Sequence, residues 1–417
     1  MTKKLFTQIK NEWQSNTWLA LELLVVSVVM WYVVDYIYTQ TATALEPKGF
    51  DIEHCYLIEM GILTDKSPGY IPNQSEEEQL KDVQEMLDRL KHRPDVEAAS
   101  LSQNSYPYNG SNSTAMVQYD TLRAPGWTIR SFVTPDFVRV FRYRGTRGET
   151  PEQLASMLED DRHFLASDNL YREYDVSLTS LVGKPFYLFG DTTSTITLGA
   201  ALQNVRYCDY AQARDSYRMV YKMPLGWMTN ATAVEWCVRV RPDQDHGFIE
   251  RLKADSEKLY RVGNIFIAEV RSFADIRNNY QRSWDTGLRN YLVGMGFLLL
   301  NIFLGLFGTF WFRTQQRRSE MALHKVHGAT GQAVFSRLLC EGVLLLLLVT
   351  PIALLVDYNL AHLELNSWRN GTTLEWGRLL ACAVISFVLM TLMIAIGNAI
   401  PARKDMQVQP AEALHDE

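Results

Sequence analysis

The short segment 314–336, between two apolar runs, holds the residues best suited to bind another protein. Its charged members surround two apolar side chains, and a glycine that can end a helix follows. Such a segment suits binding to another protein, with Glu320 paired to a basic rim and the apolar side chains in a cleft. The alternative is a solvated positive loop that only orients the chain in a membrane. The residues that we expect to act are Arg317, Arg318, Glu320, Met321, Leu323, His324, Lys325, Gly328 and Ala329.

The sequence carries none of the common catalytic motifs. It has no Gly-x4-Gly-Lys-Ser/Thr phosphate loop, no Gly-x-Ser-x-Gly elbow and no His-Glu-x-x-His helix. The eight histidines form no ligand cluster, and no cysteine pair has zinc spacing. We therefore expect no catalytic residue, no metal and no cofactor.

Four apolar runs are the elements that must position this segment. Each approaches the roughly 20 residues that a helix needs to cross a bilayer. We therefore expect an α-helical membrane protein with four transmembrane helices and a large α+β extracytoplasmic domain between the first and second spans. The expected spans are 18–40, 286–313, 337–357 and 376–400, with the domain at 41–285 and a short external loop at 358–375.

The first apolar run could be read as a signal peptide, because lysines precede it and small residues follow it at 42–44. Its length of about twenty residues exceeds the roughly 7–15 apolar residues of a cleaved peptide. We therefore interpret it as a retained anchor. Residues 1–17 are expected to form a cytoplasmic amphipathic helix that lies on the inner leaflet.

The orientation of the chain follows from basic residues close to the spans, which tend to stay in the cytoplasm. The segment 314–336 and its edges carry five basic residues against the single acid Glu320, and the tail at 401–417 begins with basic residues. Both termini and the 314–336 segment are therefore predicted to be cytoplasmic. The domain at 41–285 then lies outside.

The polar stretch has the helix and strand patterns of an α+β domain, which we expect to have two lobes. Ser75 and Glu78 have the spacing of a capping box, and a helical apolar pattern continues until Pro94. A second helix is expected over 246–260. Alternating apolar and polar residues predict half-buried strands at 115–119, 128–133 and 236–240.

The five cysteines divide between the apolar runs and the domain. Cys340 and Cys382 lie in apolar runs, where a thiol packs as a small apolar group. Cys55, Cys208 and Cys237 lie in the domain, where disulfides would persist outside the cell, but an odd number leaves at least one free. A bridge between Cys208 and Cys237 is one alternative that spacing alone does not decide.

Several short motifs occur in a fixed order over nearly the whole chain. The 314–336 segment combines a basic pair, a glutamate, an apolar pair and Gly-Ala. The domain carries Val-Thr-Pro-Asp-Phe from residue 133, followed by the stretches 166–170 and 182–185. The tail carries Pro401, Ala402 and Arg403, and then Pro410 and Leu414. In these motifs and in its four apolar runs, the chain resembles the permease subunits of MacB/FtsX-type ABC transporters, which include lipoprotein-releasing permeases.

This resemblance implies a non-catalytic permease that binds a cytoplasmic ABC ATPase and pairs with a second permease chain, either a copy or a paralogue. ATP-driven motion would pass through the 314–336 segment to a periplasmic domain, for export or extraction of an envelope substrate. The alternative is a signalling or regulatory permease that activates a periplasmic hydrolase or reports envelope stress. A receptor without an ATPase fits the motifs less well. The implied location is the bacterial inner membrane, with lipid and a periplasmic adaptor or effector as partners and no nucleic acid.

The second apolar run is rich in glycine. Gly294, Gly305 and Gly308 would let another helix approach closely, as small residues do in membrane helix pairs. The alternative is that glycine is simply frequent in membrane helices.

The first and third apolar runs contain acidic residues. Glu22 and Asp35 are expected near the two ends of the first run, because a charge at the bilayer centre is costly. Glu341 lies near the inner end of the third run, where it can meet basic residues of the 314–336 segment.

Overall fold

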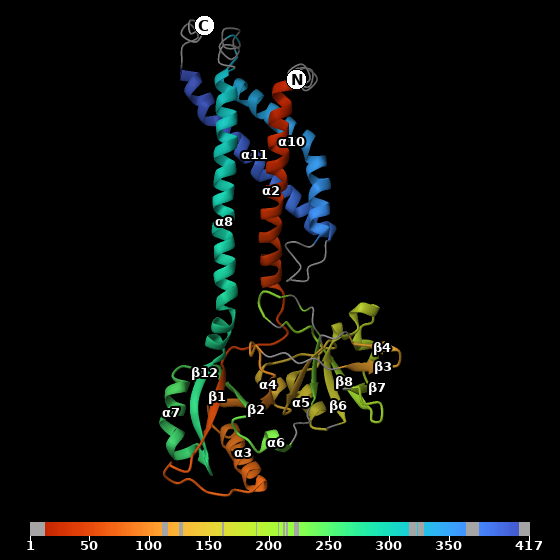
Figure 1. Cartoon of the computed structure of the whole chain (residues 1–417), viewed down its shortest axis with the longest axis vertical. Coiled ribbons are helices and arrows are strands. Elements are labelled where there is room, and N and C mark those ends of the chain that lie inside the picture. Colours follow the sequence, from red (N-terminus) through yellow and green to blue (C-terminus); the bar gives the residue numbers. More distant parts are fainter. Residues whose placement is uncertain are drawn as a thin grey trace. The chain divides into compact units, whose positions relative to one another are not determined.

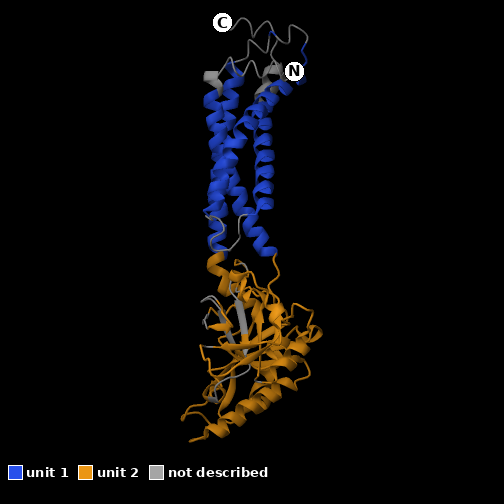
Figure 2. Ribbon diagram, turned by 90° about the vertical axis from the view of Figure 1, so that its right-hand side faces the viewer, with its two compact units in different colours: residues 1–45, 285–417 blue, residues 46–284 orange. Residues whose placement is uncertain are grey.

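The structure of the chain is a computed structural model in which two compact units can be described, one formed by residues 1–45 with 285–417 and the other by residues 46–284 (Figure 2). The described residues are 13–110, 116–124, 128–160, 162–188, 190–206, 208–211, 213, 216–220, 225–316, 323, 329–363 and 375–407.

Four long helices account for most of the first unit (Figure 1). They are α2 (Trp13–Leu45), α8 (Phe273–Gln316), α10 (Gly331–His362) and α11 (Trp376–Gln407). Each is long and apolar enough to cross a membrane. The α+β region lies between the first and the second of them in sequence, as expected.

The helices are longer than the apolar runs that predict them. α8 begins at Phe273 rather than near residue 286, because Phe273 and Ile276 are buried in a core of the second unit. α10 continues through His362, so the first residues of the expected loop at 358–375 are helical. Of the N-terminal helix expected over 1–17, residues 1–12 lie outside the described residues.

The helices α2, α10 and α11 pack against one another around one apolar core. Trp31 of α2 and Ile394 of α11 are buried there, and α8 contributes Leu306 and Phe310. Gly342 of α10 allows a close approach, because a Cβ there would lie 2.7 Å from Cγ2 of Ile394. Other large apolar side chains on these helices are exposed, which favours lipid as their surroundings. Examples are Phe297, Leu355 and Val384.

The second unit is built on a twelve-stranded mixed sheet with the order β11-β12-β1-β10-β2-β5-β9-β6-β8-β7-β3-β4. Two neighbouring pairs, β5 with β9 and β6 with β8, are parallel. The strands are β1 (Cys55–Ile62), β2 (Val96–Gln103), β3 (Val117–Tyr119), β4 (Leu122–Arg123), β5 (Thr128–Val133), β6 (His163–Ser167), β7 (Pro185–Leu188), β8 (Ile196–Leu202), β9 (Ser216–Val220), β10 (Glu235–Val240), β11 (Arg261–Val262) and β12 (Ile265–Ser272).

Both faces of the first half of this sheet are covered. Along β1, Cys55 and Leu57 belong to one apolar cluster, whereas Tyr56 and Ile58 belong to another, because successive strand residues face opposite sides. The Tyr56 side holds α3 (Glu76–Lys91) and α7 (Phe248–Leu259), and the Cys55 side holds α4 (Phe137–Val140) and α5 (Pro151–Leu158). A short helix, α6 (Leu225–Met228), precedes β10.

The predicted secondary structure of the domain is largely confirmed. The helix α3 begins with the expected capping box, in which Ser75 Oγ accepts from the Glu78 amide and Glu78 Oε2 accepts from the Ser75 amide. The predicted second helix is α7, and the three predicted strands are β3, β5 and β10, of which β3 begins two residues late.

The cysteines of the domain form no disulfide. Cys55, Cys208 and Cys237 are all buried free thiols, so the bridge between Cys208 and Cys237 that the sequence left open is absent. The two residues belong to one apolar cluster, where each thiol packs as an apolar group.

Candidate functional site

Most of the predicted partner-binding segment lies outside the described residues. This holds for Arg317, Arg318, Glu320, Met321, His324, Lys325 and Gly328. Leu323 is helical and half-exposed, and Ala329 directly precedes Thr330, whose hydroxyl caps α10 by accepting from the Ala333 amide at 3.2 Å. The role of the segment in binding therefore stays a prediction.

The tail motif divides at the end of α11. Pro401, Ala402 and Arg403 continue that helix, which ends at Gln407, whereas Pro410 and Leu414 lie outside the described residues.

The glycines of α8 face open space within the chain. A Cβ added at Gly294, Gly305 or Gly308 would meet nothing within 4 Å. They therefore do not serve packing between helices of this chain. Their surface is free for a second chain or for lipid.

The structure brings together a cluster that sequence reasoning missed, centred on Asp209 in the loop after β8. Tyr108 donates its hydroxyl to Asp209 Oδ1 at 2.6 Å, and Lys48 Nζ lies 3.3 Å from the same oxygen. Arg277, in the first turns of α8, donates Nε to Asp209 Oδ2 at 2.7 Å and also pairs through Nη2. One carboxylate thus joins a residue just after α2 to a residue at the start of α8.

Arg206 forms hydrogen bonds with backbone carbonyl groups beside Asp209. Its side chain is 1% exposed. Its Nη1 donates to the Glu46 carbonyl at 2.7 Å, its Nε donates to the Ala211 carbonyl at 2.8 Å, and its Nη2 donates to the Asp209 carbonyl. Its own amide donates to the Lys48 carbonyl at 3.0 Å. The loop 206–211 therefore holds the segment through which the chain enters the domain.

Aromatic contacts hold the start of α8, through which the chain leaves the domain. Tyr280 lies against Tyr108 with ring centroids 6.0 Å apart, and Trp284 stacks on Tyr210 at 6.3 Å. Residues 46–48 and the first turns of α8 are consequently held around one loop of the second unit. We call Lys48, Tyr108, Arg206, Asp209 and Arg277 the Asp209 cluster.

The electrostatics of the Asp209 cluster favour its charged form. Burial acts to raise the pKa of Asp209, but hydrogen bonds from Tyr108 and Arg277 and the charge of Lys48 outweigh it, so that the pKa lies below its usual value. The pKa of Tyr108 is raised, first by burial and then by its hydrogen bond to Asp209. At neutral pH the carboxylate is therefore ionised and the phenol is neutral.

A second unexpected contact joins two helices of the first unit. Arg378 of α11 binds Asp35 of α2 with two parallel hydrogen bonds, Nε to Oδ1 at 2.7 Å and Nη2 to Oδ2 at 2.6 Å. The side chains are 4% and 1% exposed. Asp35 is thus buried between two helices, and its expected position near the outer end of the first run stays a prediction. The only sequence signal is an acid in the first apolar run and a base at the start of the fourth.

Glu341 and Glu22, which also lie in apolar runs, have partners as well. Glu341 accepts from Arg313 Nη2 at 2.6 Å, which is the predicted contact with a basic residue beside the 314–336 segment. Glu22 accepts from Thr309 Oγ1 at 3.1 Å. These bonds tie α8 to α10 and α2. Over the described residues, no group of three or more histidine, cysteine, aspartate or glutamate side chains could hold a metal ion.

Comparison with known proteins does not assign the chain to a class. No family model matches it, and no curated protein matches it significantly. A functional conclusion must therefore be built from the residues and contacts described above.

Proposed function

We propose that this chain is the permease subunit of a MacB/FtsX-type ABC transporter, which transmits the motion of a separate cytoplasmic ATPase to a periplasmic domain for export or extraction of an envelope substrate. In this proposal the chain lies in the bacterial inner membrane with both termini in the cytoplasm, pairs with a second permease chain and carries no catalytic residue. The motif order and the four apolar helices support this assignment.

The observation that carries the proposal is the Asp209 cluster. A domain that is driven by helix movement needs firm attachment where each helix joins it, because a slack connection would absorb the displacement. Here Arg206 holds 46–48 and Asp209 holds both Lys48 and Arg277. The two attachments share one loop, so a displacement of α8 relative to α2 acts directly on the domain.

The proposed path of motion starts at the 314–336 segment, to which the ATPase would bind. The next contact along α8 is the ion pair between Arg313 and Glu341, and the helix then continues without a break to Phe273. A single helix of this length transmits displacement along its axis. Arg277 and Tyr280 pass it to the domain at the other end.

The first experiment tests motor binding. The full chain is purified in detergent with its cognate ATPase, and ATPase recovery is measured for wild type and for Glu320→Arg combined with Gly328→Trp. We expect the double variant to lose the ATPase, whereas Lys66→Glu, an exposed substitution in the domain, keeps it. Retention by the double variant moves the contact elsewhere. No binding by wild type refutes the permease assignment.

The second experiment tests transmission separately. Amide hydrogen exchange of the domain is compared with and without ATP in the permease–ATPase complex. We expect an ATP-dependent change in wild type that is lost in Asp209→Asn, while ATPase recovery is unchanged. The identity of the protein that co-purifies with the domain distinguishes a transporter from a regulatory permease. A periplasmic hydrolase or a sensor kinase would identify a regulatory permease.

A further inference from the structure

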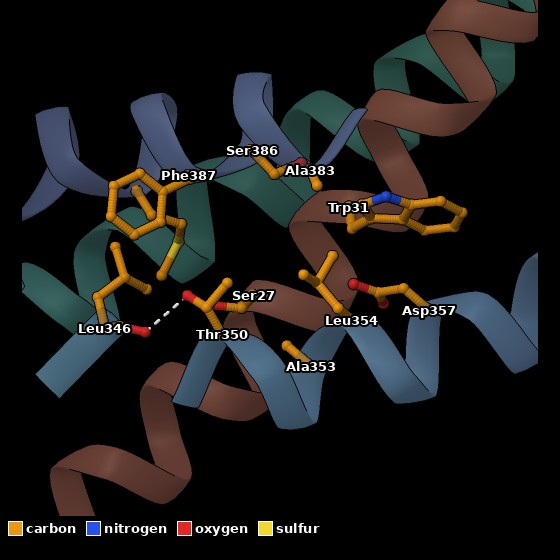
Figure 3. Close-up of a pocket in the computed structure, with 11 residues that line it drawn as sticks. Ser27, Trp31, Leu346, Thr350, Ala353, Leu354, Asp357, Ala383, Ser386 and Phe387 are labelled. Atoms are coloured by element: carbon orange, nitrogen blue, oxygen red, sulfur yellow. Dashed lines mark hydrogen bonds between the residues drawn. The ribbon is translucent and has the colours of Figure 1, made fainter. Parts of the chain in front are cut away.

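A small cavity lies among the helices α2, α10 and α11 (Figure 3). Its volume is about 20 Å³, which is more than the roughly 10–15 Å³ that one water molecule needs. Apolar side chains make part of its wall, including Leu346 and Phe387. Five polar side chains from the three helices also line it: Ser27, Trp31, Thr350, Asp357 and Ser386.

Thr350 donates its hydroxyl to the Leu346 carbonyl at 2.7 Å, whereas each of the other four polar side chains has a buried atom without a hydrogen-bond partner. The atoms are Ser27 Oγ, Trp31 Nε1, Asp357 Oδ1 and Ser386 Oγ. Buried polar atoms in folded proteins are almost always paired, so a single unpaired one calls for an explanation. Four around one cavity indicate that the cavity is built to hold a polar species.

Among the described residues near the cavity, the charges do not balance when every acid is ionised. Asp357 is 2% exposed and lies within electrostatic reach of Asp35. From α11, Arg378 gives two of its nitrogens to Asp35, whose Oδ1 also lies 3.8 Å from Cys382 Sγ. If Asp357 were ionised, the three buried groups Asp35, Arg378 and Asp357 would together carry a net negative charge. An apolar interior strongly disfavours such a charge.

Two aromatic pairs on neighbouring elements also contain titratable groups. On α10, Tyr358 stacks on His362 at 6.3 Å. On α8 and α2, Tyr291 stacks on Tyr36 at 5.1 Å. None of these four side chains carries a guanidinium or ammonium group that could balance the charge of Asp357.

We propose that Asp357 is a proton-binding site inside the helical unit. Its carboxylate takes a proton from a hydronium ion of the solvent, which leaves a water molecule, and the carboxyl group is then neutral within the packed helices. The cavity has room for one water molecule that accepts from Trp31 Nε1 and bonds to the carboxyl group and the serine hydroxyls. A metal cation fits less well, because the indole presents an N–H and the cavity has a single carboxylate.

Proton binding is then linked to helix packing. If α10 separates from α2 and α11, water can reach Asp357 and solvate its carboxylate, so that the proton is released. By reciprocity, conditions that remove the proton favour the separated arrangement. This inference uses only contacts within the helical unit and does not depend on the proposed transport function.

Infrared spectroscopy of the full chain in detergent at neutral pH tests the proposal. A protonated carboxyl group has a carbonyl stretching band that an ionised one lacks, and the band moves when the aspartates carry ¹³C in the side-chain carboxyl. We expect wild type to show one such label-sensitive band and Asp357→Asn to lack it. Asp65→Asn, which removes an exposed aspartate of the domain, is expected to keep it.

A second variant covers the case in which Asp357→Asn does not fold. In Asp357→Glu the band is expected to persist but to become insensitive to aspartate labelling. The restriction to labelled aspartate also separates this signal from buried glutamates such as Glu235. Absence of a label-sensitive band in wild type, or its survival in Asp357→Asn, would overturn the proposal.

Discussion

Asp209 keeps its charge in a buried position because three partners share it. Replacing it with asparagine leaves Lys48 and Arg277 without their acid while the volume stays the same. We expect Asp209→Asn to destabilise the domain by about 1–3 kcal/mol, the range for a charged group left without its partner. Denaturant unfolding of the full chain, followed by Trp fluorescence, measures this loss at neutral pH.

The pH dependence of the same variant has a definite sign. Because the pKa of Asp209 is lowered in the folded state, its stabilisation is fully present above the ordinary aspartate pKa of about 3.9. It is lost as the pH falls through the folded-state pKa. The difference between wild type and Asp209→Asn should therefore be constant from neutral pH to about pH 5 and shrink below about pH 4. A difference that grows on acidification contradicts the assignment.

The thiols of the domain should be chemically inert in the folded state. Burial raises the pKa of Cys55 to about 12 and raises that of Cys208 and Cys237. Since the thiolate is the reactive form, a maleimide reagent at about pH 8 should modify none of the three without denaturant. Mass spectrometry of domain peptides, before and after unfolding, checks this. Rapid native labelling of Cys237 would show that its strand opens.

At the scale of helices, the ion pair between Asp35 and Arg378 joins α2 to α11 across the bundle. Removing one member of a buried pair leaves an uncompensated charge and typically costs about 3–5 kcal/mol. We therefore expect Arg378→Met to lower the melting temperature of the full chain in detergent. The double variant Asp35→Leu with Arg378→Met should recover much of the loss, because an apolar pair of similar volume removes both charges. No recovery would mean that the geometry of the pair, and not charge balance, is what stabilises the bundle.

The elements were easier to predict than their contacts. Ser75 and Glu78 lie three residues apart, so the sequence itself contains the interaction that starts α3. Asp35 and Arg378 are separated by most of the chain, and nothing local tells which base an acid will meet. The Asp209 cluster was missed for the same reason, because Lys48, Tyr108 and Arg277 come from three distant segments. The long start of α8 was missed because its first turns are polar.

At the scale of the whole molecule, the open glycines of α8 provide a test of pairing. A side chain at Gly305 meets nothing within this chain, so Gly305→Leu should leave the fold intact. If a second chain packs closely there, as we propose, the variant should shift the protein from dimer to monomer. Light scattering of the detergent-solubilised chain measures this change.

Gly377→Leu is the matched control. Gly377 also faces open space, but it lies at the start of α11 and outside the glycine-rich part of α8. We expect this variant to remain a dimer. A dimer that tolerates leucine at both positions would place the contact between chains elsewhere.

The strand order also has a consequence for how the protein is made. β1 is the first strand to leave the ribosome, yet both of its neighbours in the sheet, β10 and β12, follow roughly 170 residues or more later. At roughly 5–20 residues per second, β1 waits about 10–30 s for its first partner. Its apolar residues are exposed during that time, so biosynthesis of this chain should depend on a chaperone that shields the nascent domain until α8 emerges.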